Sequence, residues 1–245
     1  PKSKSVISVA LNYFTGNSQE NYDPPYISNY ALGKDYHIII KSKLKQLLEE
    51  IRGINQNING FYCVDTSPIM EREWSQRAGI GWIGKNTNLI TKEFGSWIFL
   101  GELIVDCELK YDSPFKEDLC GTCNLCIDEC PTNAIVEPYH LDATKCISYV
   151  TIEHRGDFEK ENPIDLDEWI FGCDVCQEVC PWNIKFSKKS EDENFKMKEE
   201  LKIMNQNKWK NLTKEEYIKI FSKSAVKRAK YEGLKRNIEL NIKEK

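Results

Sequence analysis

The chain has 245 residues, of which 40% are apolar and 11% aromatic, so we expect a globular protein with one large domain and one or two small ones. Its net charge of −4 argues against a surface that binds nucleic acid over its whole extent. No apolar run reaches the roughly 18 residues of a membrane span, and the first residues lack the pattern of a signal peptide, which indicates a cytoplasmic protein without a membrane partner.

The first 111 residues predict an α/β domain. Residues 6–14 and 61–65 are short runs rich in β-branched and aromatic side chains, and we expect both to form strands. Residues 36–54 between them have the periodicity of an amphipathic helix. The chain opens on Pro1 and reaches the first strand almost at once, which suggests that an upstream segment is missing.

Asp65 stands where the second strand ends and a further helix is predicted to begin. We expect Ser67 to cap that helix, Pro68 to take its first position and Gly79 to end it. Ligands in α/β folds commonly bind at such strand ends. A partly buried carboxylate there can have a raised pKa and act as a general acid, whereas the alternative is a turn or capping role, and the residues alone leave both open.

Residues 79–86, GIGWIGKN, come close to a phosphate-binding loop. Asn86 stands where the magnesium-binding Ser or Thr of such a loop would be, and strand-like residues 87–91 follow instead of a helix. We therefore expect no nucleotide site here. The glycines are expected to allow the close approach of a large flat ligand or of a neighbouring strand. A further strand is expected over residues 96–106.

The character of the sequence changes at residue 112. Residues 112–186 are rich in cysteine and short of long periodic elements, which predicts a small cluster-binding domain. Residues 187–245 have helical patterns, and Thr213 and Glu216 form a capping box. From residue 196 onward there are 15 Lys and Arg against 7 Glu, a balance of +8 that leaves −12 for the first 195 residues. Such a basic segment indicates either a nucleic-acid surface or a solvated helical face.

Eight of the ten cysteines belong to two related motifs and the gap between them. Residues 120–131, CGTCNLCIDECP, have the C-x2-C-x2-C-x3-C-P spacing of [4Fe-4S] proteins, in which the fourth cysteine ligates the other cluster. Residues 173–181, CDVCQEVCP, repeat the motif with Ile170 in place of its first cysteine. Cys146, between the motifs, is the candidate replacement. The crossed pairing then gives Cys120, Cys123, Cys126 and Cys180 to one cluster, and Cys130, Cys146, Cys173 and Cys176 to the other.

Other uses of these cysteines agree less well with the sequence. Structural disulfides are not expected in a chain without secretory features. Zinc sites use paired knuckles and not a ladder of three cysteines followed by a cysteine-proline step. Cys63 and Cys107 lie outside the motifs and are expected to be small buried hydrophobes. Two clusters with exchanged ligands lie close together, which predicts a path for single electrons toward another centre.

Several segments together resemble one family, the epoxyqueuosine reductases, which are cobalamin-dependent iron-sulfur enzymes of tRNA queuosine biosynthesis. The segments are VDTSPIMEREWSQRAGIGWIGKNTNLI, GSWIFLGELIVD, CGTCNLCIDECPTNAI, CISYVTIEHRG, FGCDVCQEVCPWN and the earlier YALGKDYH. The resemblance extends over nearly all of residues 1–240. Ferredoxin motifs alone are widespread, whereas the DTSP and TIEHRG segments are specific.

The resemblance implies a cobalamin-binding α/β domain over residues 1–111, a ferredoxin-like domain with two [4Fe-4S] clusters over 112–186, and a basic helical segment over 187–245. Members of the family convert the epoxide of epoxyqueuosine, at the wobble position of certain tRNAs, to the alkene of queuosine. An external electron donor feeds the clusters, which reduce the cobalt of cobalamin.

The resemblance also carries over roles for single residues. Asp65 matches the proton donor of the family and a position beside cobalamin. Ser148 and Asp174 match positions expected near cobalamin, and Arg155 matches one expected near the RNA. The chain has three histidines, and none stands in a pattern that ligates cobalt, which is consistent with a cobalamin that has no histidine beneath its cobalt.

Two other functions are left open. A cobalamin and iron-sulfur reductive dehalogenase would use similar chemistry, but such proteins are typically exported and act on small haloorganic compounds. A ferredoxin-type electron carrier would leave the α/β domain without a task. Cobalamin binding would separate the carrier from the two enzymes, and the substrate would separate the enzymes from each other.

Overall fold

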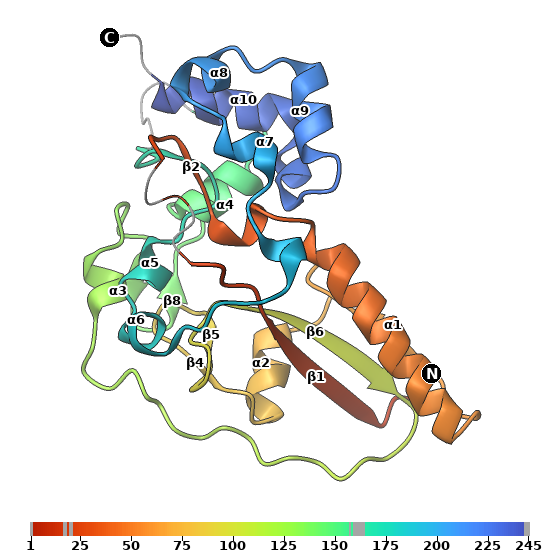
Figure 1. Ribbon diagram of the computed structural model, residues 1–245. Coiled ribbons are helices and arrows are strands. Elements are labelled where there is room, and N and C mark those ends of the chain that lie inside the picture. Colours follow the sequence, from red (N-terminus) through yellow and green to blue (C-terminus); the bar gives the residue numbers. More distant parts are fainter. Residues whose placement is uncertain (1, 17–18, 20–21, 157, 159–164, 243–245) are drawn as a thin grey trace.

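A three-stranded sheet organises the first part of the chain (Figure 1). The computed structural model describes residues 2–16, 19, 22–156, 158 and 165–242. The strands are β1 (Ser5–Asn12), β6 (Ile98–Val105) and β3 (Gly60–Cys63), in the order β1-β6-β3. Because the central β6 is antiparallel to both neighbours, β1 and β3 run in the same direction. Both begin opposite Val105, but β3 ends opposite Glu102, whereas β1 continues to Ile98.

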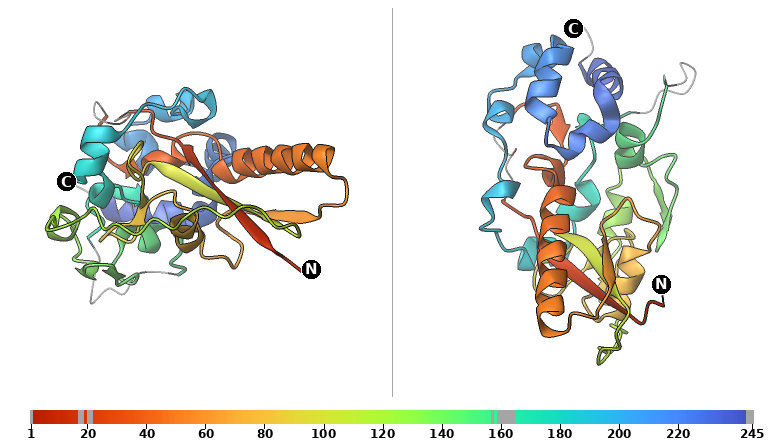
Figure 2. Two further views of the ribbon diagram at one scale, coloured as in Figure 1. Left: turned by 90° about the horizontal axis from the view of Figure 1, so that it is seen from below. Right: turned by 90° about the vertical axis from the view of Figure 1, so that its right-hand side faces the viewer.

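Helices pack on the two faces of this sheet. α1 (Tyr36–Ile54) presents one apolar stripe at helical spacing, formed by Ile39, Ile40, Leu44 and Leu48. This stripe lies so close to β6 that a Cβ on Gly101 would be 2.7 Å from the Ile40 side chain. The next residue, Glu102, points to the opposite face, where it meets α2 (Glu71–Arg77). The views in Figure 2 show α1 running along the sheet, and the predicted strands and long helix are confirmed.

The helix after β3 begins later than the sequence predicts. α2 starts at Glu71 and not at Pro68, and no side-chain cap is present at its start. The Ser67 side chain lies beside the Cys63 thiol, whose pKa it lowers, and does not cap the helix. Glu71 accepts a hydrogen bond from the backbone N–H of Asp65. These two contacts hold the intervening residues in an irregular loop, so the prediction of Ser67 as the cap is wrong.

The glycine-rich segment forms a hairpin. β4 (Trp82–Ile83) pairs in antiparallel fashion with β5 (Leu89–Ile90). A Cβ on Gly81 would lie 2.0 Å from the carbonyl oxygen of Ile90, so only glycine permits this approach. Of the two expected reasons for the glycines, the structure supports the neighbouring strand at this position. β6 follows β5, and this described stretch contains no helix of the kind that a phosphate loop requires.

Short elements carry the cysteine motifs. They are α3 (Leu125–Asp128), β7 (Ile135–Glu137), β8 (His140–Leu141), α4 (Ile147–Ile152), β9 (Trp169–Phe171), α5 (Val175–Glu178) and α6 (Pro181–Phe186). α3 and α5 each carry the middle of one motif, and they contact each other. Residues 107–120 connect the sheet to these elements without helix or strand (Figure 1).

The C-terminal part is helical, as predicted. Its elements are η2 (Glu193–Phe195), α7 (Glu199–Lys202), α8 (Gln206–Lys210), α9 (Lys214–Phe221), η3 (Ala225–Ala229) and α10 (Lys230–Asn241). The capping box of Thr213 and Glu216 at the start of α9 is confirmed. Among the described residues, no helix is long and apolar enough to cross a membrane.

The predicted boundaries at residues 111 and 186 do not separate independent cores. β2 (Tyr26–Ile27) pairs in parallel with β9, and the 3₁₀ turn η1 (Asn29–Ala31) follows it. Leu32 then packs in one apolar core with Phe171 and the C-terminal helices. The segment that contains β2 therefore leaves the three-stranded sheet and packs beside β9 and the C-terminal helices, as Figure 1 shows.

Candidate active site

Asp65 lies at the edge of the sheet where β3 ends. The strand is anchored because Cys63 and Val64 are buried in the core. Asp65 itself has a φ of 50°, in the left-handed region that few residues other than glycine adopt. Its side chain is 56% exposed, so the carboxylate is accessible to a ligand.

His37 faces Asp65 from the start of α1. The N-cap of that helix is Asp35, whose Oδ1 accepts the backbone N–H of His37 at 3.0 Å and lies 2.8 Å from the ring Nδ1. The other ring nitrogen, Nε2, lies 3.3 Å from Oδ2 of Asp65. The imidazole therefore bridges two carboxylates that come from different elements.

The two carboxylates determine the protonation of His37. Partial burial lowers the pKa of His37, but the hydrogen bonds and charges of Asp35 and Asp65 outweigh burial and raise it to about 9. At neutral pH the ring is therefore an imidazolium that donates from both nitrogens. The hydrogen bond from His37 in turn lowers the pKa of Asp65, against the effect of burial. Of the possibilities that the sequence left open for Asp65, a raised pKa is not the one found, because His37 lies beside the carboxylate.

Aromatic stacking fixes the ring of His37. Tyr36 stacks on it with ring centroids 4.1 Å apart, and on Phe99 of β6 at 4.3 Å. The Tyr36 phenol also lies beside Asp65 and helps to lower the pKa of its carboxyl group. Reasoning from the sequence gave no role to Tyr36 or His37. The available signal was the order Asp-Tyr-His at the start of a predicted helix, where the Asp caps the helix and orients the His.

Two glutamates lie behind the Asp65 loop. Glu71 accepts the backbone N–H of Asp65, and its carboxyl group is within hydrogen-bonding reach of that of Glu102. Glu102 has no exposed surface. Burial raises the pKa of both groups, and the neighbouring Glu71 helps to raise that of Glu102 to about 8. Sequence reasoning missed this pair, although a single acidic residue within the apolar run IFLGELIV is a usable signal.

The motif cysteines act on one another within two groups, and Cys176 of the second group also senses Cys126 of the first. The crossed pairing itself stays a prediction. Burial raises the pKa of the Cys126, Cys173 and Cys176 thiols, and the charge of neighbouring thiolates adds to this effect. In the first group the thiols that act on one another are Cys120, Cys123, Cys126 and Cys180. In the second group they are Cys130, Cys146, Cys173 and Cys176. Each group therefore brings four sulfurs toward one volume.

Four convergent sulfurs fit a [4Fe-4S] cluster better than a single metal ion. Within the described ranges, no three Cys, His, Asp or Glu side chains lie within reach of one metal ion. A cubane cluster needs no such proximity, because each thiolate binds a different iron atom. Ile170 is fully buried in β9, and its carbonyl accepts a hydrogen bond from Asn237. Its place in the core is consistent with Cys146 as the replacement ligand, which stays a prediction.

Lys85 and Asn86, from the turn between β4 and β5, reach both cysteine motifs. The Lys85 side chain is 8% exposed, and its ammonium donates to the carbonyls of Gly121 and Cys123 at 2.7 and 2.9 Å. It also donates to the side-chain oxygen of Asn124 at 2.9 Å. The Asn86 amide donates to the carbonyl of Cys176, in the second motif, at 3.2 Å. Lys85, in the segment that resembles a phosphate-binding loop, thus stabilises the loop that carries Cys120 and Cys123. Sequence reasoning missed this role.

Asp174 ties the second motif to the segment that leads into α1. Its Oδ1 accepts the Ser28 hydroxyl at 2.5 Å, and its Oδ2 accepts the backbone N–H and side-chain amide of Asn29 at 2.6 and 3.0 Å. The residue has no exposed surface. A direct contact between this carboxylate and a cofactor, as predicted, is therefore not supported by the structure. Its partners show that it positions the chain instead.

Ser148 and Arg155 lie at opposite ends of the α4 region. Ser148 is half-buried in the first turn of the helix. Arg155 is 44% exposed and donates to the carbonyl of Arg228 at 3.0 Å. Arg228 in turn donates to the carboxylate of Glu153 at 2.8 Å, and its charge contributes to the lowered pKa of Asp65. The basic C-terminal segment, α4 and the Asp65 loop therefore approach one another.

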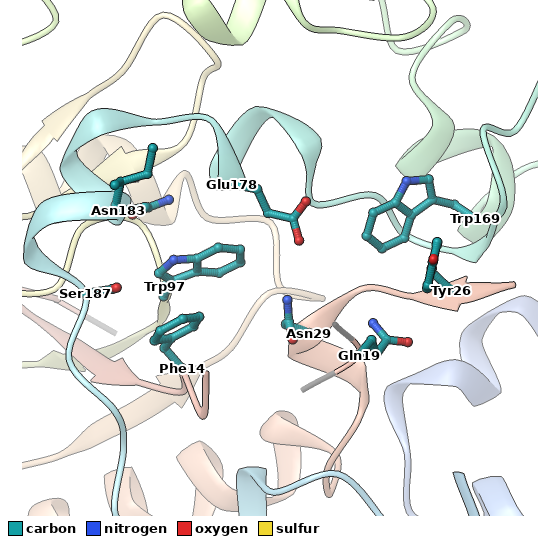
Figure 3. A pocket seen from close by; sticks show the side chains of 10 residues that line it. Phe14, Gln19, Tyr26, Asn29, Trp97, Trp169, Glu178, Asn183 and Ser187 are labelled. Atoms are coloured by element: carbon teal, nitrogen blue, oxygen red, sulfur yellow. The ribbon is translucent and has the colours of Figure 1, made fainter. Parts of the chain in front are cut away.

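A separate cavity of about 520 Å³ lies beside α5 and α6 (Figure 3). Phe14 and Trp97, stacked with ring centroids 5.3 Å apart, form one wall. Tyr26 and Trp169 line another part, and the carboxylate of Glu178 points into the space between them. None of the residues predicted to contact a cofactor lines this cavity, so it is distinct from the surroundings of Asp65.

Comparison with known proteins identifies relatives of this chain. Residues 1–66 match the family model described as "Epoxyqueuosine reductase QueG, DUF1730", and residues 119–183 match the model of a "4Fe-4S double cluster binding domain". An epoxyqueuosine reductase of Cellulophaga algicola is 49% identical over 237 residues, which cover 96% of this chain and 76% of that protein. The enzyme of the same name from Synechocystis is 42% identical, with coverages of 99% and 84%.

Solved structures agree with these relatives. A selenomethionine-labelled epoxyqueuosine reductase superposes with a TM-score of 0.90 at 29% identity, and the chain covers 65% of its length. The Bacillus subtilis enzyme, solved with its catalytic Asp loop swung out of the active site, gives 0.87 at 28% identity. A third structure, with a tRNA-Tyr epoxyqueuosine-modified stem loop, gives 0.85 at 30% identity. Each of the three matches covers 98% of the present chain.

Proposed function

The chain belongs to the epoxyqueuosine reductase family of oxidoreductases, and from this membership we propose that it reduces epoxyqueuosine in tRNA to queuosine with two [4Fe-4S] clusters and cobalamin. Conversion of the epoxide to an alkene consumes two electrons and two protons and releases the oxygen as water. The observation that carries the proposal is that one chain joins an accessible Asp65–His37 pair to eight thiols in two groups of four. The first can deliver protons and the second can hold the carriers of electrons.

We assign the delivery of the proton to Asp65 and His37 together. The departing epoxide oxygen becomes negatively charged and needs a proton. Asp65 is ionised at neutral pH, so the proton of the pair is held by His37. Transfer across the 3.3 Å contact between Nε2 and Oδ2 would let Asp65 pass it to the oxygen. General acid catalysis of this kind typically contributes about 10²–10⁴-fold to a rate.

Cobalamin, when bound, would supply the low-valent cobalt that gives electrons to the epoxide. Asp65 and Ser148 have exposed surface with which to contact it. His37 is held between two carboxylates, so it is not available to ligate cobalt from below. The two predicted groups of cysteines would hold the clusters, which when bound supply the path for single electrons from an external donor.

We propose that the tRNA lies along the basic C-terminal segment. Arg155 is exposed beside this segment, and Arg228 brings the segment close to Asp65. A solved relative contains an epoxyqueuosine-modified tRNA stem loop, which supports a substrate of this class. Contacts between these cations and phosphates would make binding weaker as salt increases.

The test uses anaerobic protein with reconstituted clusters, cobalamin, a chemical reductant and epoxyqueuosine-containing tRNA, with the nucleosides identified by mass spectrometry. Queuosine should form with the unchanged protein and with the Asp112→Ala control, which alters an exposed carboxylate far along the chain. Asp65→Ala should lose about 10²–10⁴-fold in turnover and keep the absorption bands of bound cobalamin. Dehalogenation of a small haloarene with no change in the tRNA would favour the dehalogenase. Loss of cobalamin binding in Asp65→Ala would make Asp65 a structural residue.

A further inference from the structure

A buried carboxyl pair, Glu71 and Glu102, stands directly behind the Asp65 loop. Glu102 has no exposed surface, and neither of its carboxyl oxygens meets a hydrogen-bond donor among the described residues. The group within reach is the carboxyl of Glu71. Two ionised carboxylates in a buried place repel each other, so a contact between them requires a proton.

In the part of the chain that the structure describes, the surroundings of Glu102 supply no cation to neutralise it. Ser8 of β1 and Cys63 of β3 are its register partners, on the face of the sheet that α2 covers. Ser75 lies one turn after Glu71 on the same side of α2, and the hydroxyls of both serines are buried without a partner among the described residues. The pKa of Cys63 is raised, so its thiol is neutral and cannot offset the charge.

Charged groups farther away act on Cys63 and Glu71, the neighbours of Glu102, and not on Glu102 itself. Lys41 of α1 acts on the Cys63 thiol. Asp65 and His37 act on Glu71 in opposite directions, the first raising and the second lowering its pKa. Among the described residues, the charged neighbour that acts on Glu102 is therefore Glu71.

We propose that Glu71 and Glu102 share one proton and latch the Asp65 loop, which makes them positioning residues for Asp65. The proton resides mainly on Glu102, the more deeply buried group. Glu71 then keeps a lone pair to accept the backbone N–H of Asp65, and this bond supports the left-handed conformation there. Only the importance of the latch for catalysis rests on the proposed function of Asp65. The latch itself is a property of the folded chain.

The latch should weaken as the pH rises. Burial, together with Glu71, raises the pKa of Glu102 to about 8. The shared proton is therefore present at pH 7 and lost above about pH 8, where two carboxylates would repel each other in the same space. Repulsion from Glu102 would displace Glu71, so the hydrogen bond from the backbone N–H of Asp65 to the Glu71 carboxylate is lost. The Asp65 loop is then expected to open more often.

The experiment needs no cofactor or substrate. Infrared spectra of protein with labelled glutamate carboxyls, recorded from pH 6 to pH 10, should show one protonated carboxylic acid that disappears near pH 8. Hydrogen exchange of residues 64–70 should become about tenfold faster over the same range, after correction for the intrinsic effect of pH. Glu102→Gln keeps a donor toward Glu71 and removes the titration, so the infrared band and the pH-dependent exchange should both be lost.

Glu73→Gln is the matched control, since Glu73 is the exposed glutamate of α2 that pairs with Arg77. This variant should behave as the unchanged protein does. Glu71→Ala should exchange residues 64–70 about tenfold faster at every pH. Absence of the carboxylic acid band at pH 7, or its persistence in Glu102→Gln, would refute the shared proton. Unchanged exchange in Glu71→Ala would refute the latch. Either result leaves the assignment of Asp65 as proton donor to be judged by turnover alone.

Discussion

Replacement of Lys85 by Met should loosen the first cluster. The ammonium makes three hydrogen bonds to the loop that carries Cys120 and Cys123, and the lysine is 8% exposed. Bonds from a charged donor contribute about 1.5–3 kcal/mol each. Water can replace the ammonium at Gly121 and Asn124, which are exposed, but less well at Cys123. We therefore expect a net loss of about 2–3 kcal/mol, which corresponds to a roughly 30- to 150-fold weaker hold on the loop.

The assay is the rate at which anaerobically reconstituted protein loses iron and sulfide to a chelator. Lys85→Met should lose one of two clusters faster by about this factor, while the second cluster remains. Lys92→Met serves as control, because Lys92 is a half-exposed lysine nearby that pairs with Glu117. Lys85→Arg should recover part of the resistance. Equal rates of loss for Lys85→Met and Lys92→Met would show that the buried ammonium does not support the cluster.

Two further predictions concern the proton and the second cluster. His37→Asn should lower turnover about 10²–10³-fold and remove the fall in activity that the unchanged protein should show as pH rises through about 9. The ion pairs of His37 with its two carboxylates should stabilise the folded protein fully below about pH 6.5, and this stabilisation should be lost as the pH rises through about 9. Thermal unfolding at each pH measures it. A folded state that becomes more stable over this range would contradict the assignment. Cys146→Ser should reduce the iron content to about half after reconstitution, whereas Cys107→Ser should not change it. Full iron content in Cys146→Ser would show that Cys146 is not the fourth ligand of the second cluster.

Those features of the fold that depend on local patterns follow from the sequence. The period of apolar residues predicts α1, and the Thr213 side chain with Glu216 predicts the start of α9. The spacing of the cysteines also predicts the crossed pairing of the two clusters, and this pairing stays a prediction. The start of α2 does not follow from the sequence, since a serine at position 67 can cap a helix or lie beside the Cys63 thiol. Only the tertiary structure decides between two such partners.

The electrostatics of the site could not be derived from the sequence. From the sequence, partial burial allows Asp65 to hold a proton, because burial alone favours the neutral form. The nearby imidazolium of His37 reverses this, and its position depends on how α1 meets the end of β3. Glu102 is the opposite case, a glutamate that would be assumed ionised but is buried against a second carboxyl group. Both outcomes arise from pairs of residues far apart in the chain.

The segment between β2 and α1 connects the two chemical parts of the site. At one end Asp174, between two predicted cluster ligands, holds Ser28 and Asn29. At the other end Asp35 holds His37, which reaches Asp65. The order of these contacts means that the distance between the second cysteine motif and Asp65, the proposed proton donor, is set by a short run of chain and not by a flexible linker. A site that must supply electrons and a proton to one epoxide needs this fixed spacing, because neither delivery is useful if the other is out of reach.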